Sequence, residues 1–344
     1  MIPHASIAQL VERDLAKVEA TGSNPVTRSM LRSAIMKYLL IASVFFLNTL
    51  LASESCEHSK WGKGDEIGNA NLITNKSVLN AAKLIKTGKV YSLGLTLDSN
   101  TPAYPPRSLN LQVVQPTQQF GERAFPNSTY NDDIFQGWFG IGSQLDGLGH
   151  IGGPDGKFYN CFDGKKIAPI TGLTKLGIEK VPPMVTRGVL FDMTKILGVE
   201  YLKAGQTFSV KELQLAEKTQ GIKVQKGDVV LFHTGWTDAM LEKFPEKWGA
   251  EIPGLTPELA QYLADLEVIA VGSDTYGLDV IPPVNPEEPF QGHVILLQQN
   301  GIYILEAMNT GPLANDEAFE FLFVLGQAKV RGAVQMYINP IAIR

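Results

Sequence analysis

The chain has 344 residues, of which 44% are apolar and 19% are charged, and its formal net charge at pH 7 is −5. This length suits one large domain or two small ones, and the absence of a basic excess removes the electrostatic argument for nucleic-acid binding. The chain has two cysteines, Cys56 and Cys161, outside any CxxC pattern, which argues against a zinc knuckle or a thioredoxin-type site.

The first 55 residues differ in character from the rest. Met36 and a lysine open a short basic start, and an almost uninterrupted apolar run follows over residues 38–52. Such a run is short for a membrane span and has the layout of a secretory signal peptide, with an uncleaved membrane anchor as the alternative. We therefore predict an N-terminal extension and signal peptide over residues 1–55 and one domain over residues 56–344. A polar segment precedes the signal, so Met30 or Met36 is the expected start.

Export would make the mature protein periplasmic or secreted, with no membrane attachment after signal cleavage. In such an oxidising compartment Cys56 and Cys161 could form a disulfide. Because Cys56 lies on an N-terminus that we expect to be loose, two free thiols are an equal alternative.

Three stretches carry helix signals. Helical apolar spacing follows Ser77, which is the expected cap, and Gly88 is the expected stop. Ser209 and Glu212 form a capping-box pattern three residues apart, and Pro257 stands at the first position of another helix.

Strand signals lie between these helices. Alternating or continuous apolar residues predict strands over residues 89–97, 109–114, 185–192, 229–233, 268–272, 302–305, 332–337 and 340–343. The apolar segment 317–325 fits either a helix or a strand, and the polar segment 115–133 predicts a long surface or lid loop. Because strands and helices interleave without an internal repeat, we predict a single α/β domain.

The glycine-rich segment GSQLDGLGH at residues 142–150 carries the first group of chemical side chains. Gln144 and Asp146 are two positions apart, so an extended backbone directs both to one face, and the following glycines allow His150 to turn back toward them. Oxygen and imidazole ligands of this kind suit a divalent metal ion such as Zn or Mn. The alternative is a buried, hydrogen-bonded Asp–His pair in a turn.

A second group lies far downstream. His293 precedes an apolar helix or strand, a turn follows at Asn300 and Gly301, and Glu306 ends the next strand. A chain that doubles back at this turn would bring His293 and Glu306 together. The alternatives are a capping histidine and a solvated glutamate.

From Trp61 to Arg344 the chain resembles the cyclase family, the metal-dependent hydrolases that include bacterial kynurenine formamidase and isatin hydrolase. The resemblance is carried by Trp61-Gly62, Asp65-Glu66-Ile67-Gly68, Asn71-Leu72 and residues 143–150, 229–236, 273–277, 293–306, 331–333 and 339–340. It implies a swivelling β/β/α domain with a mixed, barrel-like sheet. It also implies a homo-oligomer.

The metal motif of this family reads His-x-Gly-Thr-His-x-Asp-x-x-x-His. Asp146 and His150 match its last two ligand positions, whereas Gly140 and Gln144 stand in place of two histidines. The resemblance therefore implies one divalent metal ion, Mn or Zn, rather than two. The ligands that it implies are Asp146, His293, Glu306 and Gln144.

The resemblance also implies the chemistry, which is hydrolysis of an amide, cyclic amide or lactone bond in a small cyclic or aryl substrate by metal-activated water. His150 is the predicted catalytic proton shuttle, or it orients Asp146 as a neighbour of the metal ligands. The predicted substrate contacts are His233, Trp236, Asp274, Tyr276, Phe158 and Trp138, with turn structure or core packing as their alternatives.

Two rival functions remain open at this point. A non-catalytic small-molecule binding protein could keep the fold and a degenerate metal site, as the loss of two histidine ligands suggests. A metal-free enzyme could use His150 and Glu306 as acid and base.

Overall fold

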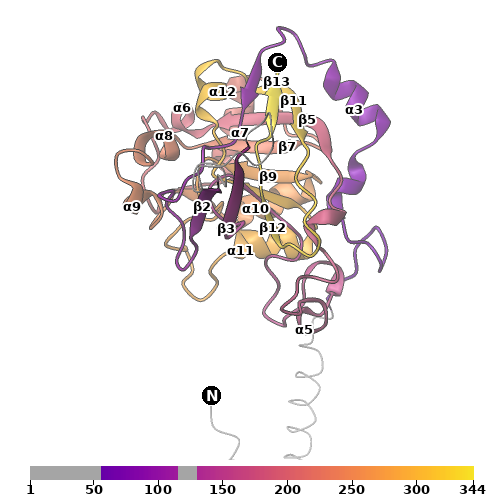
Figure 1. The fold of residues 1–344 in the computed structure, drawn as a ribbon. Coiled ribbons are helices and arrows are strands. Elements are labelled where there is room, and N and C mark those ends of the chain that lie inside the picture. Colours follow the sequence, from indigo (N-terminus) through magenta and orange to yellow (C-terminus); the bar gives the residue numbers. More distant parts are fainter. Residues whose placement is uncertain (1–55, 115–129) are drawn as a thin grey trace, which may run out of the picture. The chain divides into compact units, whose positions relative to one another are not determined.

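The structure is a computed structural model and describes residues 56–114 and 130–344 (Figure 1). The predicted signal peptide, the predicted start methionines and most of the predicted loop at 115–133 lie outside these residues. None of the helices in the described part has both the length and the apolar character needed to cross a bilayer.

A nine-stranded sheet forms the centre of the domain, in the order β1-β13-β11-β5-β7-β9-β10-β4-β12. Its strands are β1 (Val90–Ser92), β4 (Gln144–Asp146), β5 (Met184–Asp192), β7 (Val229–His233), β9 (Ala270–Ser273), β10 (Tyr303–Glu306), β11 (Glu320–Leu325), β12 (Gln335–Tyr337) and β13 (Ile341–Ile343). Two further pairs lie outside it: β2 (Leu109–Val114) with β3 (Asp132–Gly137), and β6 (Thr207–Phe208) with β8 (Gly254–Leu255).

The sheet is mixed. Strands β5, β7, β9 and β10 are parallel neighbours, whereas β1, β13, β11, β4 and β12 pair antiparallel on the two sides. Parallel strands need long crossovers, and helices supply them here. The curled sheet confirms the predicted α/β domain with a mixed, barrel-like sheet.

Most helices are short. The α-helices are α3 (Asn75–Ala82), α5 (Gly164–Ile167), α6 (Met193–Leu197), α7 (Val210–Gln220), α8 (Trp236–Met240), α9 (Pro245–Trp248), α10 (Pro257–Asp265), α11 (Gln291–His293) and α12 (Gly311–Asn315). The 3-10 helices are η1 (Gly68–Leu72), η2 (Tyr159–Cys161) and η3 (Ile178–Lys180), and η4 (Val294–Gln299) is a π-helix.

Local capping signals predicted two helix starts and misplaced a third. The Ser209–Glu212 capping box is present in both directions at the start of α7, and Pro257 is the first residue of α10. By contrast, α3 is capped by Thr74, and Ser77 is the third residue of that capping box rather than the cap. Both residues carry a hydroxyl that accepts a hydrogen bond from the main-chain N–H of the other, so the sequence pattern alone does not show which of the two is the cap.

The predicted strands are present, with shifted ends. Residues 317–325, which fitted a helix or a strand, form β11 from Glu320. The strand predicted over residues 89–97 stops at Ser92. Beyond it, the Gly94 main-chain N–H donates to the Asn339 side chain instead of a neighbouring strand.

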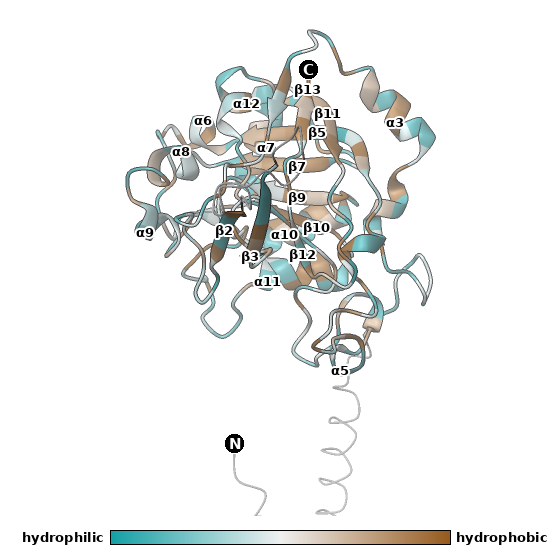
Figure 2. Cartoon of the chain, viewed as in Figure 1, coloured by the Kyte–Doolittle hydropathy of each residue, from teal (hydrophilic) through white to brown (hydrophobic). Residues whose placement is uncertain are grey.

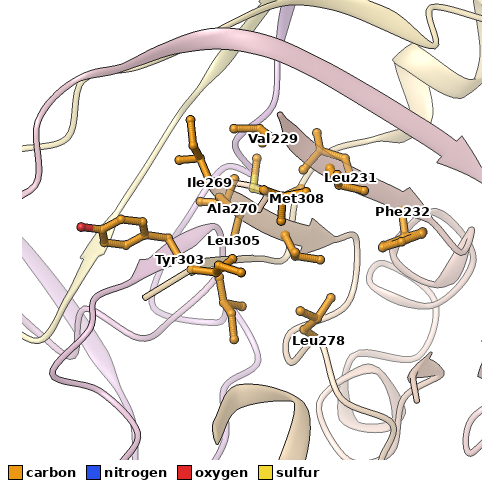
Figure 3. Packing of buried hydrophobic residues seen from close by; sticks show 14 of the residues in the cluster. Val229, Leu231, Phe232, Ile269, Ala270, Leu278, Tyr303, Leu305 and Met308 are labelled. Carbon is orange, nitrogen blue, oxygen red and sulfur yellow. The ribbon is translucent and has the colours of Figure 1, made fainter. Parts of the chain in front are cut away.

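The core lies around the parallel strands. β7 has the sequence VVLFH and is buried at all five positions, as expected for a strand covered on both faces. Figure 2 shows the central strands β5 and β7 as largely hydrophobic, whereas α3 carries both colours. In the close view of Figure 3, Leu231, Leu305 and Met308 belong to one cluster of packed apolar side chains. This packing fixes the ends of β9 and β10, next to which the polar cluster lies.

The N-terminal arm is fastened to the domain. Cys56 and Cys161 form a disulfide, so the pairing alternative is confirmed and the free-thiol alternative is wrong. The Tyr159 hydroxyl donates to Asp65 Oδ2 at 2.6 Å, which ties the segment around Asp65 to η2. Burial, together with this bond, raises the pKa of Tyr159 well above its usual value.

Candidate metal site

Three neighbouring strands place polar side chains on one face of the sheet. Gln144 and Asp146 are two apart in β4 and share a face, as predicted. Glu306 on β10 pairs directly with Gln144, and Gln335 on β12 pairs directly with Asp146. Because directly paired residues direct their side chains to the same side, all four meet there.

Hydrogen bonds join these four side chains. Gln144 Nε2 donates to Glu306 Oε2 at 2.6 Å and to Asp146 Oδ1 at 3.2 Å, and Gln335 Nε2 donates to Asp146 Oδ1 at 2.7 Å. The amide nitrogen of Gln144 therefore faces the two carboxylates. Its predicted role as a ligand through the carbonyl oxygen requires the amide to turn over.

His293 completes the cluster from the other side. It ends α11 and leads into the π-helix η4, a rare conformation that is frequent at functional sites. Its Nε2 lies 3.1 Å from Glu306 Oε1 and 3.6 Å from Asp146 Oδ2. Its Nδ1 lies 2.6 Å from Asp279 Oδ2, and this carboxylate also accepts the main-chain N–H groups of Gly292 and His293.

The donor set fits a divalent metal ion. One ligand atom each from Asp146, His293 and Glu306 lies within 4.8 Å of the others, and all three residues are buried. Asp146 Oδ2 is buried and has no hydrogen-bond partner among the described residues, although such an atom normally has one. Asp279 orients the imidazole by holding Nδ1 and leaves Nε2 directed at the carboxylates, as in carboxylate–histidine–metal arrangements.

The charges of the cluster are strongly coupled. Burial raises the pKa of Glu306, the neighbouring Asp146 charge adds to this, and the result is about 7. Burial also opposes ionisation of Asp146, but the charge of His150 and the imidazole of His293 3.6 Å away hold the pKa of Asp146 at about 2. Burial lowers the pKa of His293, yet the carboxylates of Asp146, Asp279 and Glu306 around its ring raise this pKa well above the ordinary value.

His150 lies at the margin of this cluster and is half-buried. Its ring centroid is 6.3 Å from that of His293, and its Nε2 is 3.5 Å from Gln335 Nε2. Burial lowers the pKa of His150, and the Asp146 charge counteracts this. His150 can therefore exchange a proton near the ligand atoms, although it is not one of the three candidate metal ligands, Asp146, His293 and Glu306.

The predicted substrate contacts are distributed over several places. His233 lines a separate polar cavity of about 450 Å³, and its Nδ1 lies 2.8 Å from Thr310 Oγ1. Asp274 accepts hydrogen bonds from Thr234 at the start of α8, and this holds a turn. Of this set, Tyr276 interacts electrostatically with the cluster. Burial raises the pKa of its hydroxyl most, and the charge of Glu306 raises this pKa further.

The three remaining aromatic residues of that prediction lie elsewhere. Trp236 is buried and its Nε1 donates to the carbonyl oxygen of Trp248 at 3.3 Å. Phe158 packs against the main core, and Trp138 is half exposed, with its carbonyl oxygen bonded to the Tyr337 hydroxyl.

Sequence reasoning missed Asp279 and Gln335. Gln335 lies in a predicted strand, but its role depends on the pairing of β12 with β4, which are far apart in the chain. Asp279 lies 14 residues before His293, in a segment with no periodic pattern. An acidic residue that could accept from a ligand histidine is the signal that would have found it.

Known proteins resemble this chain in sequence and in fold. A family model described as "Putative cyclase" matches residues 91–280. The chain is similar to a solved novel cyclase, with 29% identity, coverage of 83% of this chain and 96% of that one, and a TM-score of 0.76.

Two hydrolases share the fold at lower identity. Isatin hydrolase A from Labrenzia aggregata, bound to benzyl benzoate, is 18% identical, with coverage of 74% of this chain and 93% of that one and a TM-score of 0.55. An isatin hydrolase bound to the product analogue thioisatinate is 18% identical, with coverage of 78% and 98% and a TM-score of 0.56. No curated protein matches the chain significantly. Because the family model matches more than half of the 344 residues, the chain belongs to the cyclase family.

Proposed function

We propose that this protein is a metal-dependent hydrolase that cleaves an amide, cyclic amide or lactone bond in a small molecule. The observation that carries the proposal is the convergence of Asp146, His293 and Glu306, with an unpaired buried oxygen on Asp146. The names of two fold relatives, both isatin hydrolases, support a cyclic amide as the substrate.

The residues of the cluster have separate tasks. Asp146, His293 and Glu306 would hold the ion, Mn or Zn, and Gln144 would join them if its amide turned over. Such an ion lowers the pKa of water and polarises a carbonyl group. His150 exchanges the proton that moves between water and the leaving group, because its side chain is half-buried beside the cluster and imidazole titrates near neutral pH.

The first experiment is elemental analysis of the purified protein beside an Asp146→Ala variant, with Asp265→Ala as the matched control. Asp265 is exposed, and within residues 56–114 and 130–344 its side chain bonds only to Gln261 on the same helix, so its loss should not affect the metal. We expect about one equivalent of Mn or Zn in the wild type and in the control, and its loss in Asp146→Ala. Absence of metal from all three proteins, after incubation with both ions, would refute the proposal.

The same experiment tests a second candidate, a non-catalytic binding protein. One observation favours it: the Gln144 amide nitrogen bridges Asp146 and Glu306 and so partly satisfies both carboxylates without an ion. A protein that takes up no metal but binds small molecules would match this candidate. Uptake of one equivalent would exclude it as the explanation of the cluster.

We further propose export and self-association. The Cys56–Cys161 disulfide supports export, because such bonds persist in oxidising compartments. The β2–β3 pair supports a homo-oligomer, because it exposes Leu111, Val113 and Phe135 and a two-stranded sheet is marginally stable alone. Mass spectrometry of the native N-terminus and light scattering of the purified protein test these two points.

A further inference from the structure

Arg107 lies beside the metal site on the loop that leads into β2. Its side chain is half-buried, and its Nη1 donates to the main-chain oxygen of Gly140 at 2.6 Å. Gly140 stands four residues before Gln144, so this bond holds the guanidinium next to the strand that carries two residues of the cluster.

The guanidinium occupies the space that a side chain at position 140 would fill. A Cβ atom on Gly140 would lie 2.5 Å from Arg107 Nη1 and 2.7 Å from Gln335 Oε1. The arginine and Gln335 are therefore close neighbours, and Gln335 in turn donates to Asp146. Glycine at position 140 is what permits the arginine to reach this place.

The charge of Arg107 has no anionic partner within ion-pair distance among the described residues. Its guanidinium has five N–H groups, and a single one of them has a hydrogen bond within the described part of the chain, the bond to Gly140. A half-buried cation normally has an anion or several acceptors. Its charge still acts on the site, since it contributes to lowering the pKa values of both His150 and Glu306.

We propose that Arg107 binds a carboxylate of the ligand and so selects substrates that carry a negative charge close to the bond that is cleaved. This inference rests on the proposed function for the location of that bond. The fork of N–H groups matches the two oxygens of a carboxylate, which a neutral amide of the same shape cannot replace.

The test compares a carboxylate with its neutral counterpart. Binding of benzoate and of benzamide is measured by calorimetry on the full chain after incubation with Mn, and the metal content of every sample is determined. In the wild type we expect benzoate to bind about tenfold more tightly than benzamide, as a hydrogen-bonded charge pair would provide.

Four variants test whether Arg107 causes the preference for benzoate. Arg107→Gln should reduce the ratio of the two affinities to about one, and Arg107→Lys should keep part of it, because the charge remains and the fork does not. Gly140→Ala should also remove the preference, because its methyl group displaces the guanidinium without changing any charge. Lys243→Gln is the matched control, since this exposed lysine lines the other cavity, beside His233.

The results separate the two proposals. Equal affinities in the wild type, no measurable binding of benzoate, or an unchanged preference in Arg107→Gln would overturn the role of Arg107. Failure to take up Mn would instead refute the proposed hydrolase, and it would leave the comparison of benzoate and benzamide valid. A loss of the preference in both Arg107→Gln and Gly140→Ala, at unchanged metal content, is the expected result.

Discussion

The buried carboxylate of Glu306 should make the metal-free protein less stable at neutral pH. Its pKa is about 7, against an ordinary value of 4.5, because burial and the Asp146 charge both oppose ionisation. The folded state therefore binds the Glu306 proton more tightly than the unfolded state does. This contribution to stability is complete below about pH 4.5 and is lost as the pH rises through about 7. The difference between the two pKa values corresponds to about 3 kcal/mol.

The variant Glu306→Gln removes the ionisation and nearly keeps the shape. We expect metal-free wild-type protein to lose about 3 kcal/mol relative to this variant between about pH 5 and pH 8. Chemical unfolding in the presence of a chelator measures this, with exposed Glu242→Gln as the matched control. Groups outside the cluster titrate equally in both proteins, so the difference between them isolates Glu306 and the neighbouring charges that are coupled to it.

Adding Mn should reverse the order of stability. An ion that binds the folded state stabilises it, and the wild type retains the carboxylate that the variant has lost. If Glu306→Gln is no more stable than the wild type at about pH 8 in chelator, or if the difference does not change with pH, the assignment of a strained acidic cluster is wrong.

Three further predictions follow from the same structure. Asp279→Asn should weaken metal affinity about 10- to 100-fold, because an asparagine side chain has one acceptor oxygen and cannot accept both from the imidazole and from the main-chain N–H groups. Calorimetry measures this affinity, and an unchanged value would contradict the prediction. His150→Ala should keep the metal and lose about 10²- to 10⁴-fold in hydrolysis rate, whereas loss of the metal would make His150 a ligand. Replacing Cys56 and Cys161 by serine should lower the free energy of unfolding by about 2–5 kcal/mol in thermal or chemical unfolding, and an unchanged value would show that the arm adds no stability.

The sequence alone predicts those features of the fold and the site that depend on neighbouring residues in the chain. The side chains of Gln144 and Asp146 share a face because strand geometry alternates with a period of two, and this holds wherever the strand lies. The buried strand β7 follows from its apolar run, and the start of α7 follows from its capping box. The meeting of His293 with Glu306 was also foreseen, because a turn separates their elements.

Contacts that depend on long-range pairing could not be foreseen. Gln335 reaches Asp146 through the register of β12 on β4, and no pattern within either strand specifies that register. Arg107 lies before β2 in a proline-rich loop, and its guanidinium fills the space that a side chain at Gly140 would occupy. No local pattern in the sequence indicates this contact. The positions of Gln335 and Arg107 beside the cluster are thus determined by the whole fold and not by any single segment of the sequence.

The backbone around the cluster also argues for a function that uses it. Phe290, three residues before His293, has φ 58°, and Ala307, directly after Glu306, has φ 50°. Left-handed backbone at a residue other than glycine costs of order 1–3 kcal/mol and persists where surrounding contacts enforce it. Here Ser143 Oγ donates to the Ala307 carbonyl oxygen at 2.5 Å, and the Ala307 N–H donates to Thr275 at 2.6 Å, which holds Glu306 in place.

Strain at two positions, a buried carboxylate with a pKa of about 7 and an unpaired oxygen on Asp146 all destabilise the folded protein. A scaffold that only bound a neutral molecule would gain nothing from any of these features, and apolar replacements would stabilise it. A divalent ion would compensate the last two at once, because it would bind the carboxylates of both Glu306 and Asp146. The combination of these costs in one place is therefore better explained by a metal-dependent activity than by a degenerate binding site.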